Sequence, residues 1–172
     1  MQQVIVTGGN HHNTYGVIRS LGKKNITPFL LLVTSDSNSF ILRSKFISNS
    51  KIVENESMAI NFLLDNKDKL KKSIVIACSD GMSSALDINR NKLSDYYKLP
   101  GSNEQGRITY LMDKNNMSNL GEHVGFSIPR SWLVESINDI ADVEYPCISK
   151  PLISKDGSKN DIVICEYVQS IS

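Results

Sequence analysis

The chain has 172 residues, which is enough for one domain or for about one and a half, since domains commonly run to roughly 100–200 residues. Its composition, 40% hydrophobic and 22% charged, is that of an ordinary globular protein and excludes a disordered or fibrous chain. The 19 basic and 18 acidic side chains nearly cancel, so no bulk field attracts the chain to nucleic acid or to an anionic membrane, and we predict neither as a partner.

The first residues and the cysteines indicate where the protein works. The start of the chain has neither the basic region nor the apolar stretch of an export signal, and the longest apolar run, residues 28–33, is far shorter than the roughly 20 residues that span a bilayer. The three cysteines lie in apolar, strand-like runs, without the paired spacing of a zinc site or a disulfide framework; they are Cys78, Cys147 and Cys165. We therefore expect a cytoplasmic protein with buried, reduced thiols.

Strand and helix patterns alternate over the first hundred residues. Apolar runs predict strands at residues 4–6, 26–33, 52–53 and 74–78. Helical spacing predicts helices from about Tyr15 to a glycine cap at Gly22, at 56–70 and at 83–93, and the serine-rich residues 35–50 read as a loop with a short helix. Nearly continuous apolar strands are typical of a parallel sheet covered on both faces, so we predict a Rossmann-like α/β domain.

The pattern changes after the Leu-Pro-Gly-Ser segment at residues 99–102, which is the best candidate for a domain boundary. Beyond it we expect a helix at 111–123, a strand at 132–134, a short helix at 136–141 and strands at 147–149 and 162–168. The second part therefore begins helical and then turns to strands, unlike the alternating first part.

Two loops follow strands of the predicted parallel sheet, at the edge where such sheets bind ligands. Their candidate substrate-facing residues are Gly8, Gly9, Asn10, His11, Ser79 and Asp80. The first loop fits a ligand-facing loop and a structural turn equally well, and its glycine spacing is that of neither a dinucleotide fingerprint nor a phosphate loop. The adjacent His11 and His12 point apart without nearby carboxylates, so we predict no metal site. In the second loop a helix N-cap is favoured over a ligand contact.

A lysine-rich stretch at residues 145–159 has the order that a phosphate site requires. A short apolar strand ends at Lys150, Pro151 stops the strand, and a polar turn with Gly157 follows. Another lysine, Lys114, starts a predicted helix. Two such lysines at the ends of elements can converge on a triphosphate, although each one alone is more often an ordinary surface lysine.

Five segments of the chain, in this order, resemble the ATP-grasp superfamily, specifically carbamoyl-phosphate-synthase-like carboxylate–amine ligases. The segments are GVIRSLGKKNI, ILRSKF, IVIACSDGMSSALDINRNKL, MDKNNMSNLGEHVGFSIPRSW and YPCISKP. In that family a preATP-grasp domain precedes a helix that starts with Asp-Lys, a glycine–proline turn and a strand that ends in an ATP-contacting lysine. The order and spacing of these segments across nearly the whole chain carry the resemblance.

The resemblance implies a Rossmann-like preATP-grasp domain at residues 1–106 and, at 107–172, a partial ATP-grasp domain made of the Asp-Lys helix and the α+β lid subdomain. It also implies ATP contacts from Lys114, Lys150, Ser158 and Lys159, with the loop at 154–159 closing over the phosphates. The intact protein would use ATP and magnesium to activate a carboxylate as an acyl phosphate, which an amine then attacks.

The chain departs from the family where it ends. The family's adenine hinge, acidic magnesium ligands and catalytic arginine lie well downstream of the strand lysine, whereas this chain continues for only 22 residues after Lys150. We therefore expect the N-terminal part of a longer ligase, with no catalytic or metal-binding residues and no catalysis of its own. The alternative is a noncatalytic Rossmann-like module that binds a small molecule or a partner. Uncovered lid strands would also favour a homodimer through residues 145–168.

Overall fold

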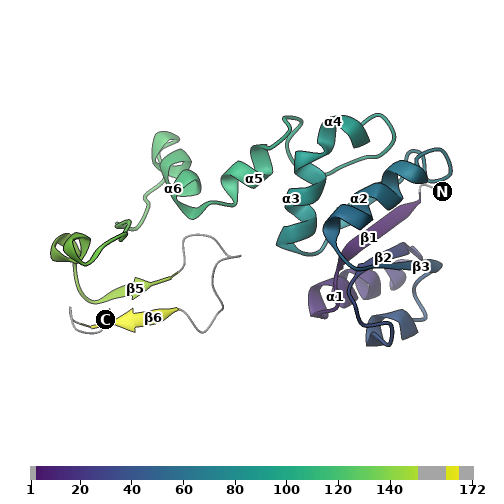
Figure 1. The fold of residues 1–172 in the computed structure, drawn as a ribbon, viewed down its shortest axis with the longest axis horizontal. Coiled ribbons are helices and arrows are strands. Elements are labelled where there is room, and N and C mark those ends of the chain that lie inside the picture. The colour runs from purple at the N-terminus through teal and green to yellow at the C-terminus, as the bar shows by residue number, and fades with distance from the viewer. Residues whose placement is uncertain (1–2, 151–161, 167–172) are drawn as a thin grey trace. The chain divides into compact units, whose positions relative to one another are not determined.

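The computed structural model describes residues 3–150 and 162–166, and it divides into two compact units, Met1–Thr109 and Tyr110–Ser172 (Figure 1). The division falls after Thr109 because residues 100–109 are attached to the first unit. Arg90 Nη2 donates to the Pro100 carbonyl oxygen at 2.7 Å. The backbone N–H of Thr109 donates to Asp87 Oδ2 at 2.8 Å. The segment at residues 99–102, which the sequence indicates as the domain boundary, is therefore packed onto the first unit.

The first unit contains a parallel sheet of four strands in the order β3–β2–β1–β4. The strands are β1 (Val4–Gly9), β2 (Phe29–Val33), β3 (Asn49–Val53) and β4 (Ile74–Ala77). Ile5 in the middle of β1 lies opposite Phe29 on one side and Val75 on the other. Side chains at the centres of β1, β2 and β4 are buried, as continuous apolar runs require. The predicted parallel α/β sheet is confirmed.

Helices cover both faces of this sheet (Figure 1). They are α1 (His12–Gly22), the 3-10 helix η1 (Phe40–Arg43), α2 (Glu56–Asp65), α3 (Asp80–Ile88) and α4 (Arg90–Leu93). Strand residues that face one way, such as Val6, pack with Ile18 of α1, whereas those that face the other way, such as Ile5, pack with Leu63 of α2. Among the described residues, no helix has the length and apolar character needed to span a bilayer.

Helix α1 differs from the prediction at both ends. It begins at His12, earlier than expected, because Nδ1 of His11 accepts the backbone N–H of Asn13 at 3.3 Å and caps the helix. The predicted glycine cap is wrong, since Gly22 is still helical and the left-handed residue beyond it is Asn25, with φ 59°. A Cβ on Gly22 would overlap the side chain of Phe46, so this glycine permits close packing instead.

The single helix predicted at 83–93 is two helices. Helix α3 begins earlier, at Asp80, because Ser79 Oγ accepts the backbone N–H of Met82 at 3.3 Å. The break between α3 and α4 lies at Asn89, whose side-chain amide donates to the Ala85 carbonyl oxygen at 3.0 Å. A side chain that bonds to the backbone in this way competes with continuation of the helix.

The second unit carries helix α6 (Lys114–His123), the 3-10 helix η2 (Ile137–Asp142) and two antiparallel strands, β5 (Cys147–Ser149) and β6 (Val163–Cys165). Helix α5 (Arg107–Leu111) lies at the division between the units. The helix predicted at 111–123 starts later, because the Asp113 carboxylate accepts the N–H groups of Asn115 and Asn116 and caps α6. The predicted strand at 147–149 is confirmed.

The strand predicted at 132–134 is wrong. These residues are extended, but in the described part of the chain no neighbouring backbone pairs with them. Their surroundings are polar instead, since the Arg130 guanidinium lies over the Trp132 ring at 5.2 Å and forms an ion pair with Glu144. An apolar run without a hydrogen-bonding neighbour does not form a sheet.

Candidate functional site

A cavity of about 460 Å³ opens at the carboxyl ends of β1 and β4. The chain leaves β1 for α1 on one face of the sheet and leaves β4 for α3 on the other face. The cavity therefore lies between two adjacent strands whose connections run to opposite faces of the sheet. This switch point is where parallel α/β sheets bind ligands. The lining residues, all from the first unit, are His11, Asn13, Val17, Ala77, Cys78, Ser79, Asp80 and Ser83.

The polar groups of the cavity can recognise a small polar molecule. Nδ1 of His11 accepts the N–H of Asn13, which leaves Nε2 as the ring nitrogen that can donate to a ligand. Asp80 is exposed in the first turn of α3, where the helix dipole stabilises its negative charge. Ser79 lines the same cavity while capping α3. A carboxylate beside hydrogen-bond donors suits a ligand that presents an amine or hydroxyl groups.

Gly8 lets the wall of this cavity close. A Cβ at Gly8 would lie 2.9 Å from Cys78 Cβ and 2.9 Å from Thr14 Oγ1, so only glycine allows the end of β1 to approach both neighbours. The Thr14 hydroxyl donates to the Gly9 carbonyl oxygen at 2.7 Å and fixes the turn into α1. Burial raises the pKa of Cys78 to about 11, so this thiol stays protonated at neutral pH and forms part of the wall rather than a nucleophile.

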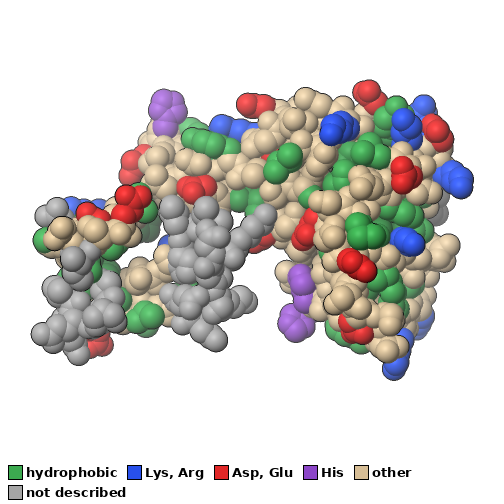
Figure 2. Space-filling view, in the orientation of Figure 1, with side chains coloured by type: hydrophobic (Ala, Val, Ile, Leu, Met, Phe, Trp, Pro, Cys, Tyr) green, Lys and Arg blue, Asp and Glu red, His purple; other side chains and the backbone are tan. Residues whose placement is uncertain are grey.

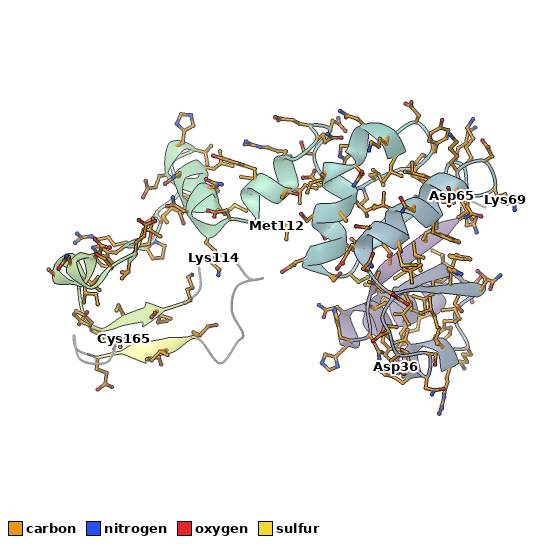
Figure 3. The ribbon with its side chains drawn as sticks, in the orientation of Figure 1. Asp36, Asp65, Lys69, Met112, Lys114 and Cys165 are labelled. Atoms are coloured by element: carbon orange, nitrogen blue, oxygen red, sulfur yellow. The ribbon has the colours of Figure 1, made fainter. Side chains whose placement is uncertain are left out.

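Asn10 holds the first loop in place and does not line the cavity. Its Oδ1 accepts the Ser39 hydroxyl at 2.6 Å, and its Nδ2 donates to Asp36 Oδ2 at 3.3 Å. Figure 3 labels Asp36 in the loop that follows β2. This network ties the loop after β1 to the loop after β2. Asn10 therefore affects the cavity only by fixing the conformation of the loop that carries His11.

The structure thus brings three of the six predicted loop residues together in the cavity: His11, Ser79 and Asp80. Asn13, Val17 and Ser83 also line the cavity. Sequence reasoning does not select them, because it assigns Val17 and Ser83 to helices and places Asn13 before the helix expected from about Tyr15. The useful signal was a capping residue, His11 or Ser79, followed within one helical turn by another polar side chain. Figure 2 shows histidine side chains at the surface, and no cluster of three or more potential metal ligands occurs among the described residues.

The second unit presents Lys150 directly after β5. The lysine is exposed, and strand alternation places it on the same face as Ile148. Ile148 pairs across the strands with Ile164, and these side chains are 63% and 71% exposed. An ammonium group beside an open apolar pair is suited to a ligand with one anionic and one apolar part. Ser158 and Lys159, together with the loop at 154–159, lie outside the described residues.

Lys114 is the first residue of α6 and is partly exposed. Its side chain leaves the first turn of the helix, as Figure 3 shows. A cation at a helix N-terminus is opposed by the helix dipole, at a cost of about 0.3–1 kcal/mol. The neighbouring Asp113 offsets part of that cost while it caps the helix. An ammonium group at this position can bind an anion.

Two solved structures with a similar fold are biotin carboxylase domains. One is the biotin carboxylase domain dimer of Hydrogenobacter thermophilus 2-oxoglutarate carboxylase in complex with MgADP, ADP and bicarbonate, with a TM-score of 0.66 and 12% identity. Another is the biotin carboxylase domain of a thermophilic 2-oxoglutarate carboxylase bound to ADP without magnesium, with a TM-score of 0.52 and 12% identity. Each similarity covers 99% of this chain and 39% of the solved chain.

Sequence comparison gives a shorter match. No family model matches the chain. A stretch of 108 residues is 32% identical to 1-deoxy-D-xylulose 5-phosphate reductoisomerase of Campylobacter hominis, and it covers 60% of this chain and 29% of that protein. The chain spans well under half of the length of each protein that it matches. The structural comparisons show that the chain shares the fold of part of a biotin carboxylase domain.

Proposed function

We propose that this chain is the N-terminal part of an ATP-dependent carboxylate–amine ligase of carbamoyl-phosphate-synthase-like type. The observation that carries the proposal is a fold similarity that covers 99% of the chain and leads to a domain solved with MgADP and bicarbonate. In this proposal residues 1–106 form the preATP-grasp domain, and residues 107–172 begin the ATP-grasp domain. The finer assignment to this ligase type rests on the sequence segments that resemble it.

The nucleotide would bind to the second unit. Lys150, which is exposed directly after β5, would contact phosphate oxygens. Lys114 would add a second ammonium group from the start of α6. Ser158 and Lys159 complete the proposed set of phosphate contacts.

The proposed chemistry has two steps. A carboxylate oxygen attacks the γ-phosphorus of ATP and ADP leaves, which gives an acyl phosphate; an amine then attacks the acyl carbon and phosphate leaves. The lysines would stabilise charge on the transferring phosphoryl group. The described residues offer no cluster of acidic side chains for magnesium, so we assign no magnesium ligand to this chain. The cavity with His11, Ser79 and Asp80 would face the substrate that carries the amine or the carboxylate.

A second candidate function is a noncatalytic binding module, and the cavity of the first unit favours it. The cavity is formed entirely within the first unit, so it needs no nucleotide and no catalytic half. The relative matched in sequence is named for a sugar phosphate, which supplies one class of probe. In this alternative the first unit binds a small polar molecule and the lysines of the second unit are ordinary surface residues.

A titration followed by NMR separates the two functions, because the proposed sites lie in different units. We expect ATP to shift the amide signals of Lys114, Ile148 and Lys150 in the uniformly labelled 172-residue chain. A charge-assisted hydrogen bond contributes about 1.5–3 kcal/mol, so Lys150→Ala should weaken ATP binding about tenfold or more. Lys69→Ala removes an exposed lysine of the first unit, labelled in Figure 3, and should leave ATP binding unchanged.

Two outcomes would contradict the ligase proposal. One is ATP binding that survives both Lys114→Ala and Lys150→Ala. The other is the absence of ATP-induced shifts in the second unit at millimolar nucleotide. Shifts confined to His11, Ser79 and Asp80 on titration with amino acids, sugar phosphates or sugar nucleotides would support the binding module.

A second copy of this chain is a further proposed partner. The hydrophobic side chains of β5 and β6 that are more than half exposed, Ile148 and Ile164, form one face of the strand pair. Exposed apolar strands of this kind favour association. The Hydrogenobacter thermophilus domain of similar fold is described as a dimer.

A further inference from the structure

Cys147 and Cys165 lie directly opposite each other in the antiparallel pair of β5 and β6. Directly opposite residues in such a pair have Cα atoms about 4.5 or 5.5 Å apart, depending on their hydrogen bonding. Both separations fall within the roughly 4.4–6.8 Å that a disulfide requires. Side chains of opposite residues also leave the same face of the strands. Figure 3 labels Cys165 on β6, next to β5. The backbone therefore presents the two thiols to each other.

The surroundings of the pair give its two sulfurs different access to solvent. Cys165 is fully buried, and its thiol donates to the Val163 carbonyl oxygen at 3.8 Å. Cys147 is only partly buried, so it is the thiol that a reagent reaches first. The Tyr145 hydroxyl is buried, and among the described residues it has no hydrogen-bond partner. Desolvation, and then the charges of Cys147 and Cys165, raise the pKa of Tyr145.

We propose that Cys147 and Cys165 are a redox-sensitive pair that closes a reversible disulfide across β5 and β6. The third cysteine, Cys78, lies in the first unit at the end of β4 and takes no part. This inference is independent of the proposed ligase function, because it needs neither nucleotide nor substrate.

The oxidant is a low-molecular-weight disulfide, and the exchange balances in two steps. The Cys147 thiolate attacks one sulfur of glutathione disulfide, which forms a mixed disulfide and releases one glutathione thiolate. The Cys165 thiolate then attacks the sulfur of Cys147 and releases the second glutathione. The two protons lost by the cysteine thiols end on the released glutathiones. Two protein thiols are thus oxidised, and one glutathione disulfide is reduced to two glutathiones.

Closure would fix the register of the two strands next to Lys150. The cross-link joins positions three residues before Lys150 and at the end of β6, so a slip of either strand past the other is no longer possible. Burial, then the charge and hydrogen bond of Cys165, raise the pKa of Cys147. The thiolate fraction, and with it the rate of the first step, should therefore rise with pH through neutral and mildly alkaline values.

The test is oxidation of the native, reduced 172-residue chain with glutathione disulfide at neutral and alkaline pH, followed by mapping without reduction. Trypsin cleaves after Lys155 and Lys159 but not before Pro151, so the two cysteines fall in different peptides. We expect one linked peptide pair that contains Cys147 and Cys165, and a mass loss of about 2 Da for the two hydrogens removed. Dithiothreitol should reverse the link, and Cys78 should remain free for alkylation after unfolding.

Single cysteine replacements show which thiols form the disulfide. Cys78→Ser should form the same link, whereas Cys147→Ser and Cys165→Ser should not, and circular dichroism shows whether each variant is folded. A linked peptide that contains Cys78 would overturn the proposal. So would persistent glutathione adducts on Cys147 without closure, or the absence of any reaction at alkaline pH in a folded chain.

Discussion

The replacement Gly8→Ala tests how the end of β1 meets its neighbours. An ideal Cβ at this position lies 2.9 Å from Cys78 Cβ, 2.9 Å from Thr14 Oγ1 and 3.3 Å from the Cys78 carbonyl carbon. The best separation for carbon atoms is about 3.5–4.0 Å, so the neighbours must move apart by roughly half an ångström or more. One of these neighbours is backbone, which cannot turn aside as a flexible side chain can.

The expected loss of stability follows from three contributions. Overpacking of a buried site costs about 1–3 kcal/mol. A displaced Thr14 hydroxyl weakens its hydrogen bond to the Gly9 carbonyl oxygen, which is worth about 0.5–1.5 kcal/mol. Alanine recovers about 0.5–1 kcal/mol because the unfolded chain loses less entropy than with glycine. We therefore expect Gly8→Ala to lower the free energy of unfolding by about 1–3 kcal/mol.

Gly9→Ala is the matched control, because the same change is made one residue later in the same strand. Its Cβ would meet the His11 ring at 3.4 Å and the Val33 carbonyl oxygen at 3.9 Å, which are ordinary contacts. We expect a stability within about 0.5 kcal/mol of the original chain, or a gain of up to about 1 kcal/mol.

Urea unfolding followed by far-ultraviolet circular dichroism measures both variants. With a urea dependence of about 2 kcal/mol per molar, in the middle of the usual range, the Gly8→Ala midpoint should fall by roughly 0.5–1.5 M. Trp132 lies in the second unit, so its fluorescence does not report directly on the first. Equal stabilities for Gly8→Ala and the original chain would refute the close approach of β1 to Cys78 and Thr14, as would an equal loss in both variants.

Tyr97 and the exposed strand pair give the remaining predictions. The Tyr97 hydroxyl donates to the Leu63 carbonyl oxygen at 2.7 Å, so Tyr97→Phe should cost about 1 kcal/mol of unfolding free energy. Burial, and then Asp68, raise the pKa of Tyr97 to about 12 from 10. Between pH 10 and about 12 the Tyr97 hydroxyl keeps its proton in the folded chain and loses it in the unfolded chain, so the free energy of unfolding should fall as the pH rises. Urea titrations at alkaline pH should show this fall in the original chain and not in Tyr97→Phe. Light scattering of the concentrated chain should show about twice the monomer mass of 19.2 kDa, and Ile164→Lys should restore the monomer. A monodisperse monomer of the original chain at high concentration would contradict the homodimer.

Local sequence patterns were sufficient to predict the strands of the sheet and the cap of one helix. Apolar runs at residues 4–6, 26–33 and 74–78 predict parallel strands covered on both faces, and β1, β2 and β4 have that arrangement. The sequence favours Ser79 as a helix cap, and Ser79 caps α3 in the structure. These features depend on residues that are close together in the chain, so the sequence alone is enough to predict them.

The candidate sites depend on contacts that no local pattern contains. His11 and Asp80 line one cavity because β1 and β4 are adjacent in the sheet, although 69 residues separate them in the chain. Gly22 packs against Phe46 and is not the cap that its position suggested. Cys147 meets Cys165 only through the register of β5 and β6. Periodicity shows which residues form a strand or helix, but burial and pairing across the whole unit decide which of their side chains meet.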